Sequence, residues 1–577
     1  MKTTSSPYST MLLSPSAAYI GAILAFASPL LAPYLVNPQP LPFYIVPACF
    51  CLFLAAVFFT RKNLLLPRYY VFLLITFISC QLVLYLYGYI NSFESWTAGL
   101  ILISVSAATF LTAGSHSPSK KLAVTFIAVS FIWSCLGIFV WLGGNQGDAL
   151  HFGMWALTTD AQVKINGPFT NGNVLGIISA CTWVIAVWWW LQAKKHAWLG
   201  WALVCFFWYM IALSMSRGAW VAQSVIILPI IFWIWNHKRR SLLWFVLAGL
   251  LAWGAASTTI SELYPSSAIS ITERFETSAT YGFAERVVLW ASAWEIWKAH
   301  PILGVGIGSF GAHYLDGQSQ ALQWLGSEHH GLRQTTNPHN TLLHLMAESG
   351  IIGMVLWIAI TTLLARLCWL YRHHIHSIRW AALSCAVMLW IQGLFNISMS
   401  EPFPLLLFSL MFGWAAAPLL RKGEKLKIPG RPLSFLTITC SVLLAFAAFN
   451  TAQAWMNFET WRLLEQSHPA KGALAAKLIQ RSDTMPYVIE ASARDFIGDP
   501  NKTDAVGKMQ PFIEQALTIQ QRRLLLQELF FAQVVNNKLE EACRTGRFIQ
   551  SQKWGETNNS ELYKQACNGE NFLTRSQ

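Results

Sequence analysis

The stretch AWLGWALVCFFWYMIALSMSRGAWVAQSVIILPIIFWIWN occupies residues 197–236, and Arg217 is its one charged side chain. About 17 to 25 consecutive apolar residues are enough for an α-helix to cross a bilayer. The stretch therefore predicts two membrane-spanning helices, 197–215 and 218–236, that meet at Arg217.

The same pattern recurs on both sides of this stretch. Of the 577 residues, 54% are hydrophobic and 12% are charged, whereas soluble domains carry about 25% charged residues. The sequence predicts an all-α polytopic membrane protein with about 13 transmembrane helices. The other spans are expected at 17–36, 42–60, 70–90, 97–114, 122–143, 172–193, 241–259, 345–365, 380–398, 402–420 and 433–453. The first is taken as uncleaved, because its apolar run is too long for a signal peptide and lacks a strongly basic start.

Basic residues between the spans give the expected orientation. They gather in six clusters that the spans place on one side, and such positive loops are cytoplasmic. The clusters hold Arg61, Lys62 and Arg68; Lys120 and Lys121; Lys194 and Lys195; Lys238, Arg239 and Arg240; Arg366, Arg372 and Arg379; and Arg421, Lys422, Lys425, Lys427 and Arg431. The N-terminus is then cytoplasmic and the C-terminus outside. Since these loops account for the net charge of +13, no nucleic-acid partner is expected.

This arrangement predicts three domains. Residues 1–160 hold N-terminal transmembrane helices, and residues 161–453 form a transmembrane core. That core includes a long outward loop at 260–340, and residues 454–577 form an outward helical domain.

The outward tail carries two further signals. Its helical periodicity fits either paired amphipathic helices resembling a tetratricopeptide array or a plain small bundle, because no clear 34-residue period is present. Cys543 and Cys567 lie in the tail, whereas the other nine cysteines lie in predicted spans or, for Cys368, just past the end of one. An oxidising compartment therefore predicts a Cys543–Cys567 disulfide.

The outward loop 260–340 contains the chemically informative text. Its first part runs from Arg286 to His300-Pro301-Ile302-Leu303-Gly304-Val305-Gly306-Ile307-Gly308, and Pro338-His339-Asn340 follows some thirty residues later. The three glycines resemble a dinucleotide fingerprint, but that motif needs a preceding strand and a following helix. A tight turn that ends an amphipathic helix is the better interpretation, because glycine adopts unusual backbone angles.

Several polar residues could bind or react, and each has a simpler explanation. An unperturbed histidine has a pKa of about 6.5, which suits proton transfer, so His339 could act in this way, or it could merely begin a helix. Arg286 and Arg274 lie in a segment whose tryptophans at 290, 294 and 297 predict a helix on the membrane surface, where an arginine could meet lipid phosphate. Arg217 could bind an anion or snorkel to the interface. Lys164 could extend an anion site or belong to a structured loop.

A metal site is not predicted. His344 and Glu348 share a helix face, and His329 and His330 are neighbours, but the sequence has no His-Glu-x-x-His motif. Glu348 is expected near the membrane boundary, where a carboxylate needs a partner. Pairing with His344 or an arginine is the preferred interpretation, and no cofactor is expected.

At these residues the chain resembles the O-antigen ligase and polymerase superfamily. The matching text is Ser216-Arg217-Gly218, the segment from Arg286 to Phe310, and the segment from Pro338 to Gly350, within a core of roughly residues 165 to 400. The long tail is more similar to that of protein O-oligosaccharyltransferases, the pilin glycosylation ligases.

The resemblance implies a metal-independent glycosyltransferase of GT-C type in the bacterial inner membrane. It would move a preassembled glycan from undecaprenyl diphosphate to an acceptor hydroxyl on the periplasmic face. Arg217 and Arg286 fall on the family's arginine positions, and His339 falls on its essential histidine. The full substrate-binding set is expected to be Arg217, Arg286, Arg274, Lys164 and Asn340.

The tail favours a pilin or another exported protein as acceptor, with serine or threonine hydroxyls receiving the glycan. The same site would serve an O-antigen ligase acting on lipid A–core, or an O-antigen polymerase. A non-enzymatic transporter of lipid-linked glycan is an alternative of another class. It would need polar groups within the cytoplasmic halves of spans, which the sequence does not show. Membrane lipids are expected partners in every case.

Overall fold

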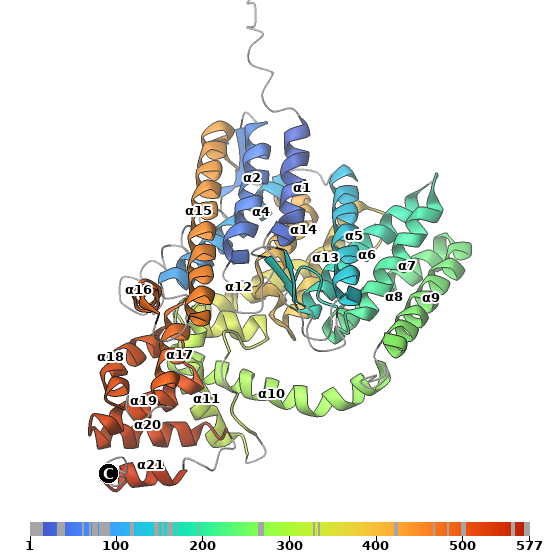
Figure 1. Ribbon diagram of the computed structural model, residues 1–577. Helices are drawn as coiled ribbons and strands as arrows, with labels where there is room; N and C mark the ends of the chain where they lie inside the picture. Colours follow the sequence, from blue (N-terminus) through green and yellow to red (C-terminus); the bar gives the residue numbers. More distant parts are fainter. Residues whose placement is uncertain are drawn as a thin grey trace, which may run out of the picture. The chain divides into compact units, whose positions relative to one another are not determined.

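The protein is described by a computed structural model (Figure 1). The described residues are 15–31, 41–60, 63–68, 71, 75, 79, 93–115, 120–143, 149–152, 155–158, 165–169, 171–193, 195–263, 271–326, 329–332, 335–420, 425–464, 468–481, 484–497, 503–554 and 560–569. Helices dominate these residues, which confirms the predicted all-α membrane fold.

The chain divides into two compact units. The first is built from Met1–Phe77, Ile101–Arg274 and Ile360–Thr451. Its helices are α1 (Pro15–Leu31), α2 (Leu41–Phe59), most of α4 (Phe93–Ser115), α5 (Lys120–Gly143), α6 (Gly172–Gln192), α7 (Ala197–Leu213), α8 (Arg217–His237), α9 (Arg239–Leu263), α13 (Ile378–Gly393) and α14 (Pro402–Leu420).

Aromatic side chains fill the centre of the first unit. Trp183 of α6 is fully buried, and its ring centroid lies 5.0 Å from that of Trp208 in α7 and 5.9 Å from that of Phe245 in α9. Small residues bring helix backbones close together. At Gly200, for example, an added Cβ would lie 2.9 Å from the Trp190 Cα atom of α6.

Eight helices among the described residues are long and apolar enough to cross a membrane, and four shorter ones are also apolar. Most of the expected span at 70–90 lies outside the described residues. Among the helices that run beyond their expected spans are α12, which covers Thr341–Tyr371, and α15, which covers Gly430–Leu463. The first is interrupted at Gly350, where the backbone is not helical (φ 59°, ψ −144°).

Two short antiparallel ladders were not expected. Strand β1 (Asn63–Pro67) pairs with β4 (Lys425–Pro429), so that Leu65 faces Lys427. Strand β2 (Ala149–Phe152) pairs with β3 (Trp155–Thr158). The first ladder joins segments 360 residues apart, which hydropathy along the chain does not reveal. It also brings two of the six basic clusters to the same end of the helices.

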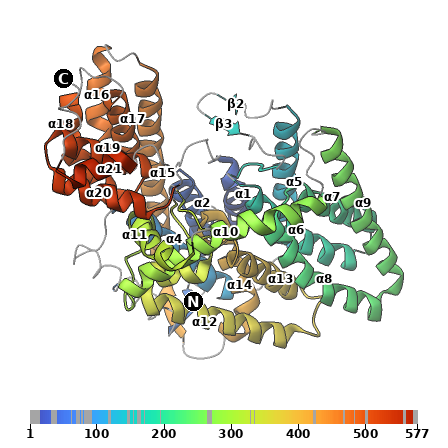
Figure 2. The same cartoon turned by 90° about the horizontal axis from the view of Figure 1, so that it is seen from below.

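The second unit is built from Ile78–Leu100, Phe275–Ala359 and Ala452–Gln577. It contains most of α10 (Ile271–Ala299), α11 (Phe310–Trp324), the first part of α12, the end of α15, α16 (Pro469–Leu478), α17 (Met485–Ile497), α18 (Thr503–Ile519), α19 (Arg523–Val535), α20 (Leu539–Ser551) and α21 (Ser560–Cys567). Each helix from α17 to α21 packs against the next (Figure 2).

The C-terminal helices and α11 share one hydrophobic core. Phe310, Tyr314 and Leu315 of α11 are fully buried and belong to the same cluster as Phe530 of α19 and Ile549 of α20. A disulfide links Cys543 of α20 with Cys567 of α21.

Alternate helices of this bundle begin at near-even intervals. Helix α17 begins at Met485, α19 at Arg523 and α21 at Ser560. Such spacing is compatible with paired helices and with a plain bundle, the two descriptions that the sequence leaves open.

Candidate functional site

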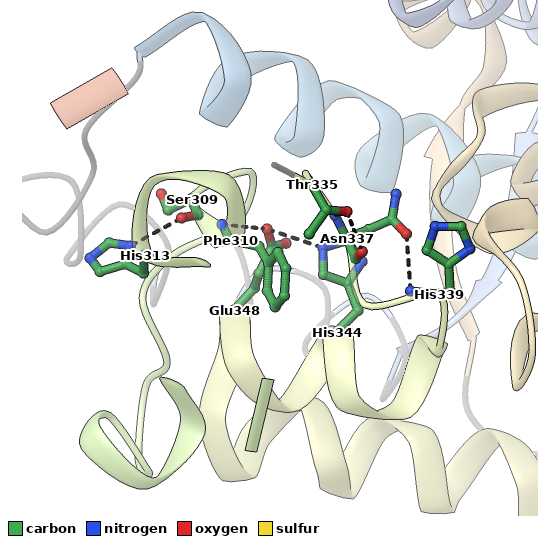
Figure 3. Close-up of polar contacts among 8 residues, drawn as sticks. All are labelled: Ser309, Phe310, His313, Thr335, Asn337, His339, His344 and Glu348. Atoms are coloured by element: carbon green, nitrogen blue, oxygen red, sulfur yellow. Dashed lines mark hydrogen bonds and ion pairs between the residues drawn. The ribbon is translucent and has the colours of Figure 1, made fainter. Parts of the chain in front are cut away.

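The loop that carries His339 is fixed by hydrogen bonds of its own side chains. The Thr335 hydroxyl donates to the Asn337 carbonyl at 2.8 Å, and the Asn337 side-chain oxygen accepts from the His339 N–H at 3.1 Å (Figure 3). Asn340 begins helix α12 because its side-chain oxygen accepts from the Leu343 N–H at 3.2 Å. The expected helix start after His339 is therefore present.

His339 has an unusual backbone conformation. Its φ of +54° lies in the left-handed region, which few residues other than glycine adopt. Such conformations cost of order 1–3 kcal/mol and persist only where the surroundings impose them, often at functional sites. The Asn337 side chain binds the His339 N–H directly, and the Asn340 side chain fixes the start of α12 one residue later.

The surroundings of His339 keep its imidazole neutral. Burial, and second the positive charge of Arg286, lower the pKa of His339 to about 4. An imidazole with that pKa is uncharged throughout the neutral pH range, and one of its two ring nitrogens carries no proton. It can therefore accept a proton from a bound hydroxyl.

Helix α10 carries Arg286, and the fold brings this residue close enough to His339 for their charges to interact. The arginine is half-buried. Its helix is anchored by buried Val288 and Leu289, whereas Trp294 is 43% exposed. Two residues more than fifty positions apart thus meet in the second unit.

The glycine turn between α10 and α11 packs against the interruption in α12. Gly304, Gly306 and Gly308 all have positive φ angles, as expected of a tight turn. The Gly306 N–H donates to the Glu348 carbonyl at 3.0 Å. An added Cβ at Gly304 would lie 2.3 Å from the Glu348 carbonyl carbon, and one at Gly350 would lie 2.3 Å from the Ile302 oxygen. No larger side chain fits at these two positions.

Glu348 joins three parts of this site. Its carboxylate accepts from the Phe310 N–H at 3.2 Å and lies 3.2 Å from Nε2 of His344 (Figure 3). Phe310 is the first residue of α11, and within the described structure the preceding Ser309 side chain makes no capping hydrogen bond. Glu348 therefore supplies the negative charge that a helix N-terminus favours. The expected pairing with His344 is present, whereas the cap on α11 was not foreseen.

Arg217 lies in the first unit, at the start of α8. The turn before it contains Met215 with φ +51°, and the Ser216 hydroxyl caps the helix by accepting from the Ala219 N–H at 3.3 Å. The Gln392 side-chain amide donates to the Asn173 carbonyl at 2.8 Å. This amide connects the ends of α6, α8 and α13 around Arg217.

The remaining candidates are placed only in part. Arg274 belongs to α10, but its side chain lies outside the described part of the structure. Lys164 also lies outside it. Within the described residues, no three His, Cys, Asp or Glu side chains gather as they would around a metal ion.

Sequence reasoning missed the residues that support the site. Thr335, Asn337 and Phe310 were not singled out, because their roles depend on contacts that form only in the folded chain. One signal was readable: Asn two residues before His339 fits a side-chain turn that tolerates a left-handed residue next to it.

Comparison with known proteins identifies one family. Residues 201–358 match the model of the O-antigen ligase family. The matched region contains Arg217, Arg286 and His339, and it confirms the resemblance to the O-antigen ligase superfamily. No curated protein matched the chain. The match supports a membrane protein that transfers glycans, of the ligase or polymerase type.

Proposed function

We propose that this protein transfers a preassembled glycan from undecaprenyl diphosphate to serine or threonine hydroxyls of exported proteins, such as pilin. The observation that carries the proposal is His339, a half-buried neutral imidazole held in a left-handed conformation and within reach of the charge of Arg286. The imidazole is unprotonated at neutral pH and can therefore accept or orient a hydroxyl proton, although a pKa of about 4 makes it a weaker base than an ordinary histidine.

The proposed reaction is a single glycosyl transfer. The acceptor hydroxyl oxygen attacks the anomeric carbon of the first sugar, and the bond from that carbon to the diphosphate oxygen breaks. His339 takes the hydroxyl proton and later releases it to water. Arg286 stabilises the negative charge that develops on the departing lipid diphosphate, since guanidinium groups bind phosphate oxygens through paired hydrogen bonds. The family resemblance implies the same role for Arg217.

We assign the site to the periplasmic side of the bacterial inner membrane. The positive-inside rule favours this orientation. The β1–β4 ladder supports it further, because basic clusters that the rule assigns to one side meet in that ladder.

A protein acceptor is favoured by the C-terminal helical bundle, which offers far more docking surface than a sugar acceptor needs. The second candidate is ligation to lipid A–core, which is favoured by the family match. Both use the same bond-forming step, so the acceptor separates them.

The test uses purified full-length protein with one defined lipid-linked glycan. Three acceptors are offered in parallel: pilin, lipid A–core and the donor itself. We expect glycosylated pilin, detected by intact-mass spectrometry. Transfer to lipid A–core alone would make the protein a lipopolysaccharide ligase, and chain elongation alone would make it a polymerase.

A further inference from the structure

Two glutamines from distant parts of the chain form a buried polar network. Gln318 lies in α11, Gln552 directly follows α20, and both side chains are fully buried. The Gln318 Nε2 atom donates to the Gln552 Oε1 atom at 2.6 Å, and the Gln552 Nε2 atom donates to the Leu315 carbonyl at 2.9 Å. The Tyr314 hydroxyl also donates to the Gln318 Oε1 atom.

The network binds the backbone of Gly331 and Leu332. The Leu332 N–H donates to the Gln318 Oε1 atom at 2.8 Å, and the Leu332 carbonyl accepts from the Gln318 Nε2 atom at 3.1 Å. The same carbonyl accepts from the Trp554 indole at 3.1 Å, and the Gly331 N–H donates to the Gln552 carbonyl at 3.0 Å. The four backbone hydrogen bonds just described for Gly331 and Leu332 therefore all join them to Gln318, Gln552 or the nearby Trp554.

Gly331 is required by this geometry. An added Cβ would lie 2.1 Å from the Gln552 carbonyl oxygen, so no larger residue fits. Other polar contacts fasten the same part of the bundle to α11. The Lys553 ammonium donates to the Leu322 carbonyl at 2.7 Å, and the Ser319 and Ser551 hydroxyls are hydrogen-bonded.

Leu332 lies seven positions before His339. We propose that Gln318 and Gln552 are positioning residues for His339, and that the C-terminal bundle is therefore a working part of the transfer site as well as a docking surface. The segment that carries His339 is anchored at one end by the two glutamines and at the other by the Asn340 cap of α12. This inference rests on the proposed role of His339 in glycan transfer.

The energetic reason lies in the burial of the network. A buried amide that loses its partners keeps the full cost of its removal from water, and a fully satisfied network specifies one arrangement. Gly331 and Leu332 are thus held in one place by buried groups for which water is no substitute. Loss of the bundle would remove Gln552, so deletion of the tail would disturb the reacting residue as well as acceptor docking.

The test compares two substitutions in the full-length protein. Gln552→Met keeps the side-chain length and removes the side-chain bonds to Gln318 and to the Leu315 carbonyl. It therefore acts on Leu332 through Gln318, while the backbone bond from Gly331 to Gln552 is kept. Gln533→Met is the matched control, because Gln533 is also buried in the bundle and its side-chain oxygen accepts from the Thr545 hydroxyl at 2.8 Å, away from α11 and Leu332. Hydrogen exchange of the peptide that contains Gly331 and Leu332 is measured for both variants, together with kcat, KM for the donor and thermal unfolding.

We expect Gln552→Met to speed exchange at Gly331 and Leu332 and to lower kcat by roughly 100-fold, since small displacements of reacting groups have effects of that size. The KM for the donor should change little. Gln533→Met should leave both exchange and kcat as in the wild type. In addition, Gln318→Met combined with Gln552→Met should be no worse than either alone, because the two residues act as one unit.

Two results would overturn the inference. Unchanged exchange at Gly331 and Leu332 in Gln552→Met would mean that the glutamine does not hold this segment. An equal fall of kcat in both variants would mean that the effect comes from bundle stability. The exchange measurement needs no substrate, so it tests whether the two glutamines hold Gly331 and Leu332 even if the wild-type protein transfers no glycan to pilin. Failure to glycosylate pilin would refute only the proposed acceptor.

Discussion

His339 is the residue on which the proposed chemistry depends, and its backbone dictates how it should be tested. We expect His339→Ala and His339→Asn to abolish transfer while membrane insertion is retained. The asparagine variant is the cleaner one, because asparagine tolerates the left-handed conformation that His339 adopts. Transfer to pilin is measured at equal protein levels. His313→Ala is the control, since His313 lies in α11 and its Nδ1 atom contacts the Ser309 carbonyl at 3.0 Å. Near-normal transfer by His339→Asn would show that His339 is not the base of the reaction.

Arg286 has two separable effects, one on His339 and one on the donor. Below its pKa of about 4 the His339 imidazole is protonated and cannot act as a base, so kcat/KM should fall as the pH falls through about 4. Arg286→Gln removes the positive charge and should move this acid limb to higher pH, toward the ordinary histidine value. The shift should be partial, because burial is the larger cause of the low pKa.

Arg286→Lys is the matched variant for that measurement. It keeps the charge but loses the planar fork that binds phosphate oxygens. We expect weaker donor use with the acid limb in its wild-type position. An acid limb that stays in place in both variants would show that Arg286 does not act on His339.

At the scale of elements, the site depends on how the glycine turn packs against the break in α12. Gly350→Ala would introduce a Cβ 2.3 Å from the Ile302 carbonyl oxygen at a φ of +59°, a conformation that costs an L-residue about 1–3 kcal/mol. We expect a lower Tm and strongly reduced transfer, measured on purified protein in detergent.

Gly254→Ala is the control for this prediction. Gly254 lies in α9 and has no atom within 4 Å of an added Cβ, so alanine should be neutral or slightly stabilising in that helix. If both variants unfold at the wild-type temperature, the close packing at Gly350 does not contribute to stability.

The α20–α21 pair provides a second prediction at this scale. Cys543 and Cys567 are 24 positions apart and form a disulfide. A covalent link over a loop of this size stabilises by roughly 3 kcal/mol in chain-entropy estimates. We expect Cys543→Ser with Cys567→Ser to lower the Tm and to destabilise α21. In the wild type, alkylation without reductant should leave both thiols unlabelled. Labelling of both would mean that the bond is absent in cells or that the tail faces the cytoplasm.

For the whole molecule, the proposed mechanism assigns diphosphate binding to arginines. Transfer should therefore continue in EDTA, measured with the same donor and pilin before and after chelation. A loss of transfer that manganese or magnesium restores would refute the arginine assignment.

The amino-acid sequence determined the membrane character of the chain. Apolar length and charge are local quantities, so spans such as 218–236 could be predicted without knowledge of the path of the chain, and α8 lies where expected. The glycine turn and the start of α12 were also predictable, because turn and cap residues act on their neighbours. The expected span at 70–90 and Lys164 lie largely or wholly outside the described residues.

Tertiary structure alone decided what surrounds His339. The charge of Arg286 acts on it across more than fifty residues, Glu348 caps a helix 38 positions away, and Gln552 contacts Gln318 across 234 positions. The β1–β4 ladder is another contact between distant parts of the sequence, since its strands lie about 360 residues apart. Contacts at such separations depend on how whole helices pack, and many packings satisfy one hydropathy pattern. The sequence could therefore supply the candidate residues, whereas the pKa of His339 and the groups that hold its loop required the folded chain.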